Sequence, residues 1–156
     1  DGSNATIRPD VKLLLVNLVN IGKPIVALCV SPIVLAKAFE GSMIQPKMTI
    51  GSKNGASPYS ISDFEDGLTT TGAITVDLPL GEVLIDEENR IITAPCYMMN
   101  ARISEIQENI QALNQFIRLN MFKLLGKIMH FIPSEMQPLD QKNFPKAMFS
   151  NNINSC

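Results

Sequence analysis

Residues 22–39, GKPIVALCVSPIVLAKAF, constrain the fold of this chain more than any other stretch. The run Ile25–Leu28 is short and uniformly apolar, as a buried strand is, and Pro32 opens a stretch whose apolar residues recur at helical spacing. Cys29 therefore lies on the predicted turn between a strand and a helix. A side chain at such a turn points out from the carboxyl end of the sheet and faces the first amides of the helix, which favour a thiolate. The pattern predicts a nucleophilic cysteine; a buried cysteine that only fills apolar space is the alternative on spacing alone.

Size and charge limit the class of protein. The chain has 156 residues, of which 46% are hydrophobic, enough for one domain with a core. Its formal net charge is −2 and it has no cluster of lysine and arginine, so we expect no nucleic-acid partner. The longest apolar stretches, around residues 13–19 and 25–30, are shorter than the roughly 20 residues that span a bilayer. We therefore expect a soluble protein that does not enter a membrane.

The cysteines and the histidine argue against a metal centre. Cys29, Cys96 and Cys156 form no CxxC pair, and His130 is the only histidine, so the familiar ligand spacings of zinc sites are missing. A disulfide scaffold is not expected at this cysteine density either, which favours a reducing compartment. We predict no metal and no cofactor.

The rest of the chain alternates helical and strand patterns. A helix is predicted from Pro9 until Gly22 stops it, and Ser62 with Asp63 is predicted to cap a second short helix that runs through Thr70. Further predicted elements are strands over residues 47–50 and 74–78, a hairpin over 82–94 and a long amphipathic helix whose apolar stripe is Ile103, Ile106, Ile110, Leu113 and Ile117. Residues 1–132 are predicted to form the domain, and residues 133–156 an irregular tail.

Other chemically active residues have plain alternatives. Cys96 follows Pro95 at the entry to the long helix, where it is either a second low-pKa thiol or, as we favour, a packing residue. Tyr97 at the same entry lines a crevice or covers the hairpin. Asp86, Glu87 and Glu88 form an acidic run that is expected to be solvated on a turn.

Several motifs together resemble one family. GKPIVALCVSP, MTIGS, ASPYSISDFEDGL and EVLIDEENRIITAPCYM, followed by a long helix, resemble the carboxyl-terminal half of the ElbB family, the lycopene-enhancing or isoprenoid-biosynthesis glyoxalase-like proteins. The resemblance covers about residues 1–120. The loop with Ser57-Pro58-Tyr59 is most similar to the eukaryotic, mitochondrial members, so the resemblance implies a mitochondrial location, with the cytosol as the alternative.

The resemblance implies a fold and an activity. The family lies in the PfpI-type, class I glutamine amidotransferase-like superfamily, with a doubly wound α/β fold: a mostly parallel sheet in a three-layer αβα, flavodoxin-like sandwich. It implies that Cys29 is the nucleophile of a glyoxalase-like enzyme that needs no cofactor. Cys29 would add to a small aldehyde or dicarbonyl, and the amides of Val30 and Ser31 would hold the developing oxyanion. Gly51, Ser52, Cys96 and Tyr97 are candidates for lining the crevice.

The chain also departs from that pattern. Gly51 and Ser52 stand where many superfamily members place a histidine, so glutamine amidotransferase activity is not expected. The acidic partner of the cysteine comes from a first strand that has no counterpart here, and we infer that the domain is incomplete at its N-terminal side. An incomplete sheet would leave a strand edge uncovered, which favours a homodimer. The alternative to an enzyme is a redox-sensing or regulatory binding module, or an inactive fragment.

Overall fold

The computed structural model describes residues 5–131, and its side chains as far as residue 118 with the exception of Phe116. The predicted tail, residues 133–156, lies outside the described residues. Contacts divide the chain between Ile117 and Arg118, inside its last helix. The packing described below is that of the part up to Ile117.

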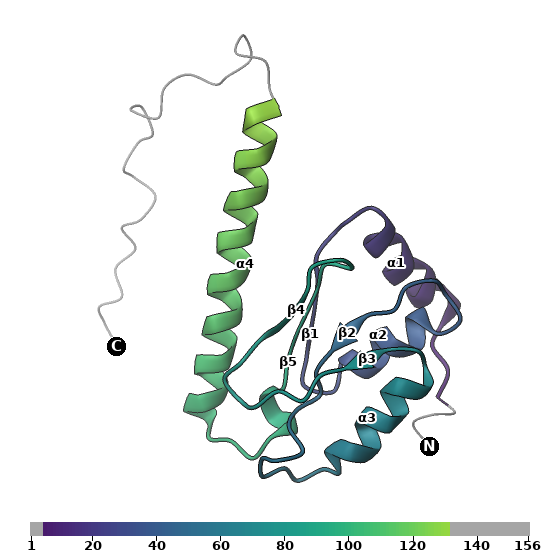
Figure 1. Cartoon of the computed structure of the whole chain (residues 1–156), viewed down its shortest axis with the longest axis vertical. Helices are drawn as coiled ribbons and strands as arrows, with labels where there is room; N and C mark the ends of the chain where they lie inside the picture. Colours follow the sequence, from purple (N-terminus) through teal and green to yellow (C-terminus); the bar gives the residue numbers. More distant parts are fainter. Residues whose placement is uncertain (1–4, 132–156) are drawn as a thin grey trace, which may run out of the picture. The chain divides into compact units, whose positions relative to one another are not determined.

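The elements follow the predicted order of helices and strands (Figure 1). They are α1 (Pro9–Asn20), β1 (Ile25–Leu28), α2 (Pro32–Phe39), β2 (Lys47–Met48), α3 (Ile61–Thr70), β3 (Ile74–Thr75), β4 (Leu84–Asp86), β5 (Ile91–Ala94), the 3₁₀ helix η2 (Cys96–Met98) and α4 (Ile103–Phe131). Strands β2 and β3 are shorter than predicted. Beyond Met48 the N–H groups bond to side chains: the Thr49 N–H donates to Thr93 Oγ1 and the Gly51 N–H to Thr49 Oγ1. The Gly51 carbonyl still accepts from the Leu78 N–H at 3.1 Å.

The α/β class predicted from the sequence is confirmed. The strands form two small sheets: a three-stranded sheet of order β1-β5-β4 and a parallel pair of β2 and β3. Strands β1 and β5 are parallel, with Leu28 opposite Ala94, whereas β4 and β5 form the predicted antiparallel hairpin. Parallel neighbours end at the same edge of a sheet, so the residues that follow Leu28 and Ala94 meet.

Helices cover both faces of the β1–β5 pair. Ile25, Ala27 and Ile91 belong to the larger core cluster, against which Leu15 and Val19 of α1 also pack. The opposite face carries Leu28 and Ala94, and there Ile106 of α4 completes a second, smaller cluster. Alternation of side chains along the strands produces these two faces. The result is an αβα arrangement of layers around a short parallel pair.

One edge of β1 carries no strand among the described residues. β1 pairs with β5 alone. The N–H groups of Ile25 and Cys29 donate to β5, so the backbone groups of Val26 and Leu28 point away from it. The Val26 side chain is 41% exposed, a large fraction for an apolar residue in a strand of this kind. The uncovered edge expected from the sequence is therefore present.

Two details of the helices differ from the prediction. Helix α3 begins at Ile61 with Ser60 as its N-cap residue, two residues before the predicted cap at Ser62. In α4 the inward residues up to Leu113 are Ile106, Asn109 and Leu113, while Ile103 and Ile110 are 77% and 37% exposed. Asn109 takes the inner position of the stripe because its amide has partners there, as described below. Among the described residues, no helix combines the length and the apolar character that a membrane span requires.

Asp86 does not belong to a solvated acidic run. Its side chain is 2% exposed, whereas Glu87 and Glu88 are exposed as predicted. Asp86 accepts bonds from the Lys47 N–H at 2.8 Å and from the N–H and Nδ2 of Asn89 at 3.2 and 2.7 Å. This carboxylate joins the end of β4 to β2 and to the hairpin turn, so its role is structural.

Candidate functional site

The backbone at Cys29 has the shape of a nucleophile elbow. Cys29 follows β1 directly and has a φ of 60°, in the left-handed region that residues with a Cβ rarely adopt. Its N–H donates to the Ala94 carbonyl at 3.1 Å, which fixes the start of the turn against β5. Pro32 then fixes the start of α2. The side chain is half-buried, so the sulfur is neither sealed in the core nor fully in solvent.

The two amides after Cys29 differ in what they bind. The Ser31 N–H donates to the Leu28 carbonyl at 3.1 Å, and Ser31 Oγ donates to the same oxygen at 2.6 Å. These bonds close the turn and commit the Ser31 amide to it. The Val30 N–H has no hydrogen-bond acceptor among the described residues. The Val30 residue is 51% exposed. Val30 is therefore the amide that is available to an anion beside Cys29.

Cys96 lies beside the elbow and not at the entry of the long helix. It is the first residue of η2, well before α4 begins at Ile103, and the prediction that it stands at the mouth of that helix is wrong. Pro95 turns the chain immediately after β5, because its ring favours the compact φ of −63° seen there. Cys96 has a φ of 46° and is 3% exposed, and Cys29 packs against the cluster that it forms with Ala94 and Ile106.

Asn109 is a site residue that the sequence reasoning missed. It is 1% exposed, and its Oδ1 accepts from the Cys96 N–H at 3.3 Å and from Cys96 Sγ at 3.5 Å. Its Nδ2 donates to the Glu82 carbonyl at 3.1 Å. A polar residue at an inner position of an amphipathic helix was the available signal, since buried amides need partners. Asn109 holds the Cys96 backbone and thiol in place.

Burial raises the pKa of the Cys96 thiol above its ordinary value. The negative charge of a Cys29 thiolate raises this pKa further, and the backbone amide of Cys29 lowers it by less. Cys96 is thus a neutral thiol at physiological pH.

Gly51 and Ser52 are both buried and pack against Met99. A Cβ on Gly51 would lie 2.8 Å from Met99 Sδ, and its φ of 139° also favours glycine. The Ser52 N–H points to the same sulfur at 3.4 Å. Tyr97 is 52% exposed, on the short η2 that leads to Met99. The structure therefore connects Gly51 and Ser52 to the segment after β5 through Met99, and leaves the Tyr97 ring in solvent.

A buried carboxylate lies near the same loop. Glu65 of α3 is 6% exposed and forms an ion pair with Lys53 at 2.8 Å, which raises the pKa of Lys53. Its Oε1 has no hydrogen-bond partner. The sequence offered no signal for it, because Glu65 stands among the polar residues of a short helix.

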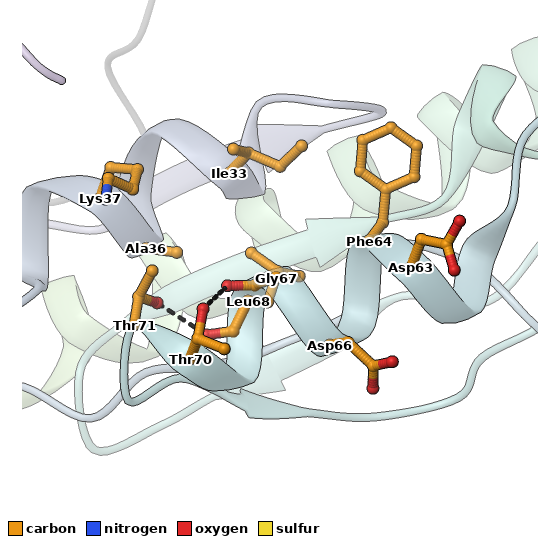
Figure 2. Close-up of a pocket in the computed structure, with 10 residues that line it drawn as sticks. All are labelled: Ile33, Ala36, Lys37, Asp63, Phe64, Asp66, Gly67, Leu68, Thr70 and Thr71. Atoms are coloured by element: carbon orange, nitrogen blue, oxygen red, sulfur yellow. Dashed lines mark hydrogen bonds between the residues drawn. The ribbon is translucent and has the colours of Figure 1, made fainter. Parts of the chain in front are cut away.

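A separate cavity of about 430 Å³ lies between α2 and α3. Figure 2 shows the residues that line it: Ile33, Ala36, Lys37, Asp63, Phe64, Asp66, Gly67, Leu68, Thr70 and Thr71. Two of its hydroxyls are committed to the helix backbone, since Thr70 and Thr71 donate to the carbonyls of Gly67 and Leu68. None of the predicted site residues lines this cavity, so it is distinct from the elbow.

Among the described residues no group of three or more histidine, cysteine, aspartate or glutamate side chains is arranged to hold a metal ion. The His130 side chain lies outside the part whose side chains are described. The reactive groups around the elbow are therefore two thiols, one half-buried and one buried, with an amide N–H beside the first.

These environments predict an order of labelling. At neutral pH iodoacetamide should modify Cys29 first. Cys96 should react at least about tenfold more slowly, because it is buried and its pKa is raised. Labelling of Cys96 should accelerate at alkaline pH, where the thiolate forms. Peptide mapping by mass spectrometry across a pH series measures both rates in a Cys156→Ser background. Equal rates at the two cysteines would contradict the environments described here.

No protein-family model matches the chain. A human protein described as glutamine amidotransferase-like class 1 domain-containing protein 3, mitochondrial, is 25% identical over 116 residues, which cover 72% of this chain and 41% of the human protein. A rat protein described as ES1 protein homolog, mitochondrial, is 24% identical over 116 residues, with the same two coverages.

A solved structure is similar to this chain over the same share of its length. The crystal structure of an isoprenoid biosynthesis protein with an amidotransferase-like domain from Ehrlichia chaffeensis superposes with a TM-score of 0.55 at 26% sequence identity. The match covers 72% of this chain and 49% of the Ehrlichia chain. This chain therefore spans about two fifths of the length of the curated relatives it matches and about half of the solved structure.

Proposed function

Since this chain is homologous over about 72% of its length to class I glutamine amidotransferase-like, ES1 and isoprenoid-biosynthesis (ElbB-like) proteins, we propose that it acts on small reactive dicarbonyls with Cys29 as nucleophile and no cofactor. The observation that carries this proposal is the strained backbone of Cys29 at the β1–α2 turn. A left-handed cysteine is costly, by roughly 1–3 kcal/mol, and such strain is concentrated where a side chain must be presented for chemistry.

The proposed reaction has three steps. The Cys29 thiolate adds to the aldehyde carbon of a dicarbonyl such as methylglyoxal, and the carbonyl oxygen becomes the oxyanion of a hemithioacetal. The Val30 N–H is the donor that we assign to this oxyanion, since the Ser31 N–H is bonded to Leu28. A base then moves a proton from the aldehyde carbon to the neighbouring carbonyl carbon, which gives a thioester. Water hydrolyses the thioester to the hydroxy acid and frees the thiol.

Glutamine hydrolysis is not part of the proposal. Gly51 and Ser52 stand where an amidotransferase histidine would be expected, and both are buried against Met99. Among the described residues no histidine side chain is present to activate Cys29.

Conversion of methylglyoxal to lactate tests the proposal. The purified chain should consume methylglyoxal without glutathione or metal, and proton NMR in D₂O should show lactate that carries deuterium at its second carbon, since the proton moves through an exchangeable base. If methylglyoxal is lost only as stable adducts on lysine and arginine, with no lactate, the enzymatic proposal is wrong.

We also propose that the open edge of β1 pairs with β1 of a second copy about a two-fold axis. The outward N–H and carbonyl of Val26 and the outward N–H of Leu28 would then bond across the dimer, and the exposed Val26 side chains would be covered. Val26→Lys should weaken self-association by about tenfold or more in analytical ultracentrifugation, whereas Leu13→Lys, on the exposed face of α1, should not. A chain that is monomeric at all concentrations, or equal effects of the two variants, would rule out this interface.

The names of the human and rat relatives support a mitochondrial location for the protein. Fractionation of source cells, probed with an antibody against this chain, separates this proposal from a cytosolic location.

A further inference from the structure

Two cysteines leave neighbouring parallel strands at the same edge of the sheet. Cys29 is the first residue after β1, and Cys96 is the second after β5, whose end is paired in register with the end of β1. The Cys29 N–H donates to the Ala94 carbonyl at 3.1 Å, so the two chains are still side by side where the cysteines begin. Both residues have positive φ, 60° at Cys29 and 46° at Cys96. The backbone is thus turned sharply at both thiols.

The surroundings give the two thiols different roles. Cys29 is half-buried and reaches solvent, while Cys96 is 3% exposed and is held by Asn109, which accepts from both its N–H and its thiol. Cys29 packs against the small cluster that contains Cys96. A small oxidant from solvent therefore reaches Cys29 first, while Cys96 stays buried as a protonated thiol.

The spacing suits a covalent bond between them. Leu28 lies opposite Ala94, so Cys29 is one residue and Cys96 two residues beyond a paired position. The paired strands lie about 4.8 Å apart, and a disulfide joins Cα atoms that are roughly 4.4–6.8 Å apart. Cys29 also packs against the small cluster of Cys96, Ala94 and Ile106, which brings the two cysteine side chains into one apolar group.

We infer that Cys29 and Cys96 form a reversible disulfide, with Cys29 as the thiol that reacts with a hydroperoxide and Cys96 as the thiol that resolves the product. In the first step the Cys29 thiolate attacks the peroxide, the O–O bond breaks, and Cys29 becomes a sulfenic acid while the peroxide is reduced to an alcohol or water. In the second step the Cys96 sulfur displaces the hydroxyl of the sulfenic acid, and the Cys96 proton leaves with it as water. A dithiol reductant restores both thiols.

This modification does not depend on dicarbonyl turnover. It would, however, block any chemistry of Cys29 while the disulfide lasts, and it would protect Cys29 from irreversible oxidation to the sulfinic acid. The bond between Cys96 Sγ and Asn109 would be lost on oxidation, since a disulfide sulfur has no proton to donate.

Oxidation with one equivalent of hydrogen peroxide, in a Cys156→Ser background, tests the inference. After alkylation of the remaining thiols and digestion, mass spectrometry should show the peptides of Cys29 and Cys96 joined by a disulfide that a dithiol reductant removes. In the Cys96→Ser variant the reaction should stop at a Cys29 sulfenic acid that dimedone traps. In the Cys29→Ser variant Cys96 should stay reduced. Accumulation of the sulfenic acid in the protein that keeps both cysteines, with no disulfide, would overturn the inference.

A trivalent arsenical tests the proximity of the thiols without oxidation and without a substitution at either cysteine. Phenylarsine oxide binds two thiols only when both sulfurs reach the same arsenic atom. It should be retained by the Cys156→Ser protein through a wash with a monothiol and released by a dithiol. Release by the monothiol would show that the two sulfurs cannot meet. Because neither readout uses methylglyoxal, failure of this inference and failure of the dicarbonyl activity are separate results.

Discussion

Cys29→Ala is expected to lower methylglyoxal turnover by at least roughly a thousandfold, because it removes the atom that forms the covalent intermediate. Cys29→Ser should be almost as poor, since a serine hydroxyl is far less acidic than a thiol and is a weak nucleophile at neutral pH. Lactate formation followed by NMR at saturating substrate measures the change in kcat.

Two further variants separate loss of the nucleophile from loss of the fold. Cys29→Gly keeps the turn and relieves the strain at its φ of 60°. We expect this variant to be more stable than the parent chain by about 0.5–1 kcal/mol and yet inactive. Cys156→Ser removes another thiol and should leave turnover unchanged. An active Cys29→Gly protein would show that the sulfur is not the nucleophile.

Asp86→Ala is expected to destabilise the protein by about 3 kcal/mol, which corresponds to a fall in Tm of roughly 10 °C. The substitution leaves the N–H groups of Lys47 and Asn89 without their acceptor, and it leaves Asn89 Nδ2 with the Gln45 carbonyl alone. It also disconnects β4 from β2. Thermal unfolding followed by circular dichroism measures the shift.

The neighbouring acidic residue provides a matched control. Glu87→Ala changes the same charge one position away, but Glu87 is exposed, so its effect should stay within about 0.5 kcal/mol. If the two alanine variants lose the same stability, then the effect comes from the charge of the run and the buried bonds of Asp86 contribute little.

Local patterns were sufficient for most elements. Helix α1 ends before Gly22, α2 begins at Pro32, and β4 and β5 form the predicted hairpin. Each of these depends on residues within a few positions: a proline that fixes φ, a glycine that adopts positive φ, or apolar residues at one spacing. Resemblance of several motifs to one family also survived comparison with known proteins.

Patterns of burial were harder to predict where a polar side chain has a partner distant in the sequence. Asp86 was expected in solvent and is buried, because the N–H groups of Lys47 and Asn89 donate to its carboxylate. Ile110 was expected in the core, and Asn109 is there instead, because Cys96 and Glu82 provide its hydrogen bonds. A prediction from hydrophobic spacing uses only the free energy of moving each side chain from water to the core. It does not include the hydrogen bonds that a buried polar side chain forms after folding.

The sequence by itself determined that Cys29 lies on a turn between a strand and a helix, since that turn is built from contiguous residues. Only the tertiary structure decided that Cys96 lies beside it, that Asn109 holds Cys96, and that the Ser31 amide is occupied while the Val30 amide is available. The reason is physical: the parallel pairing of β1 with β5 joins segments that are far apart in the chain, and its register is set by packing on both faces of the sheet and not by any local signal.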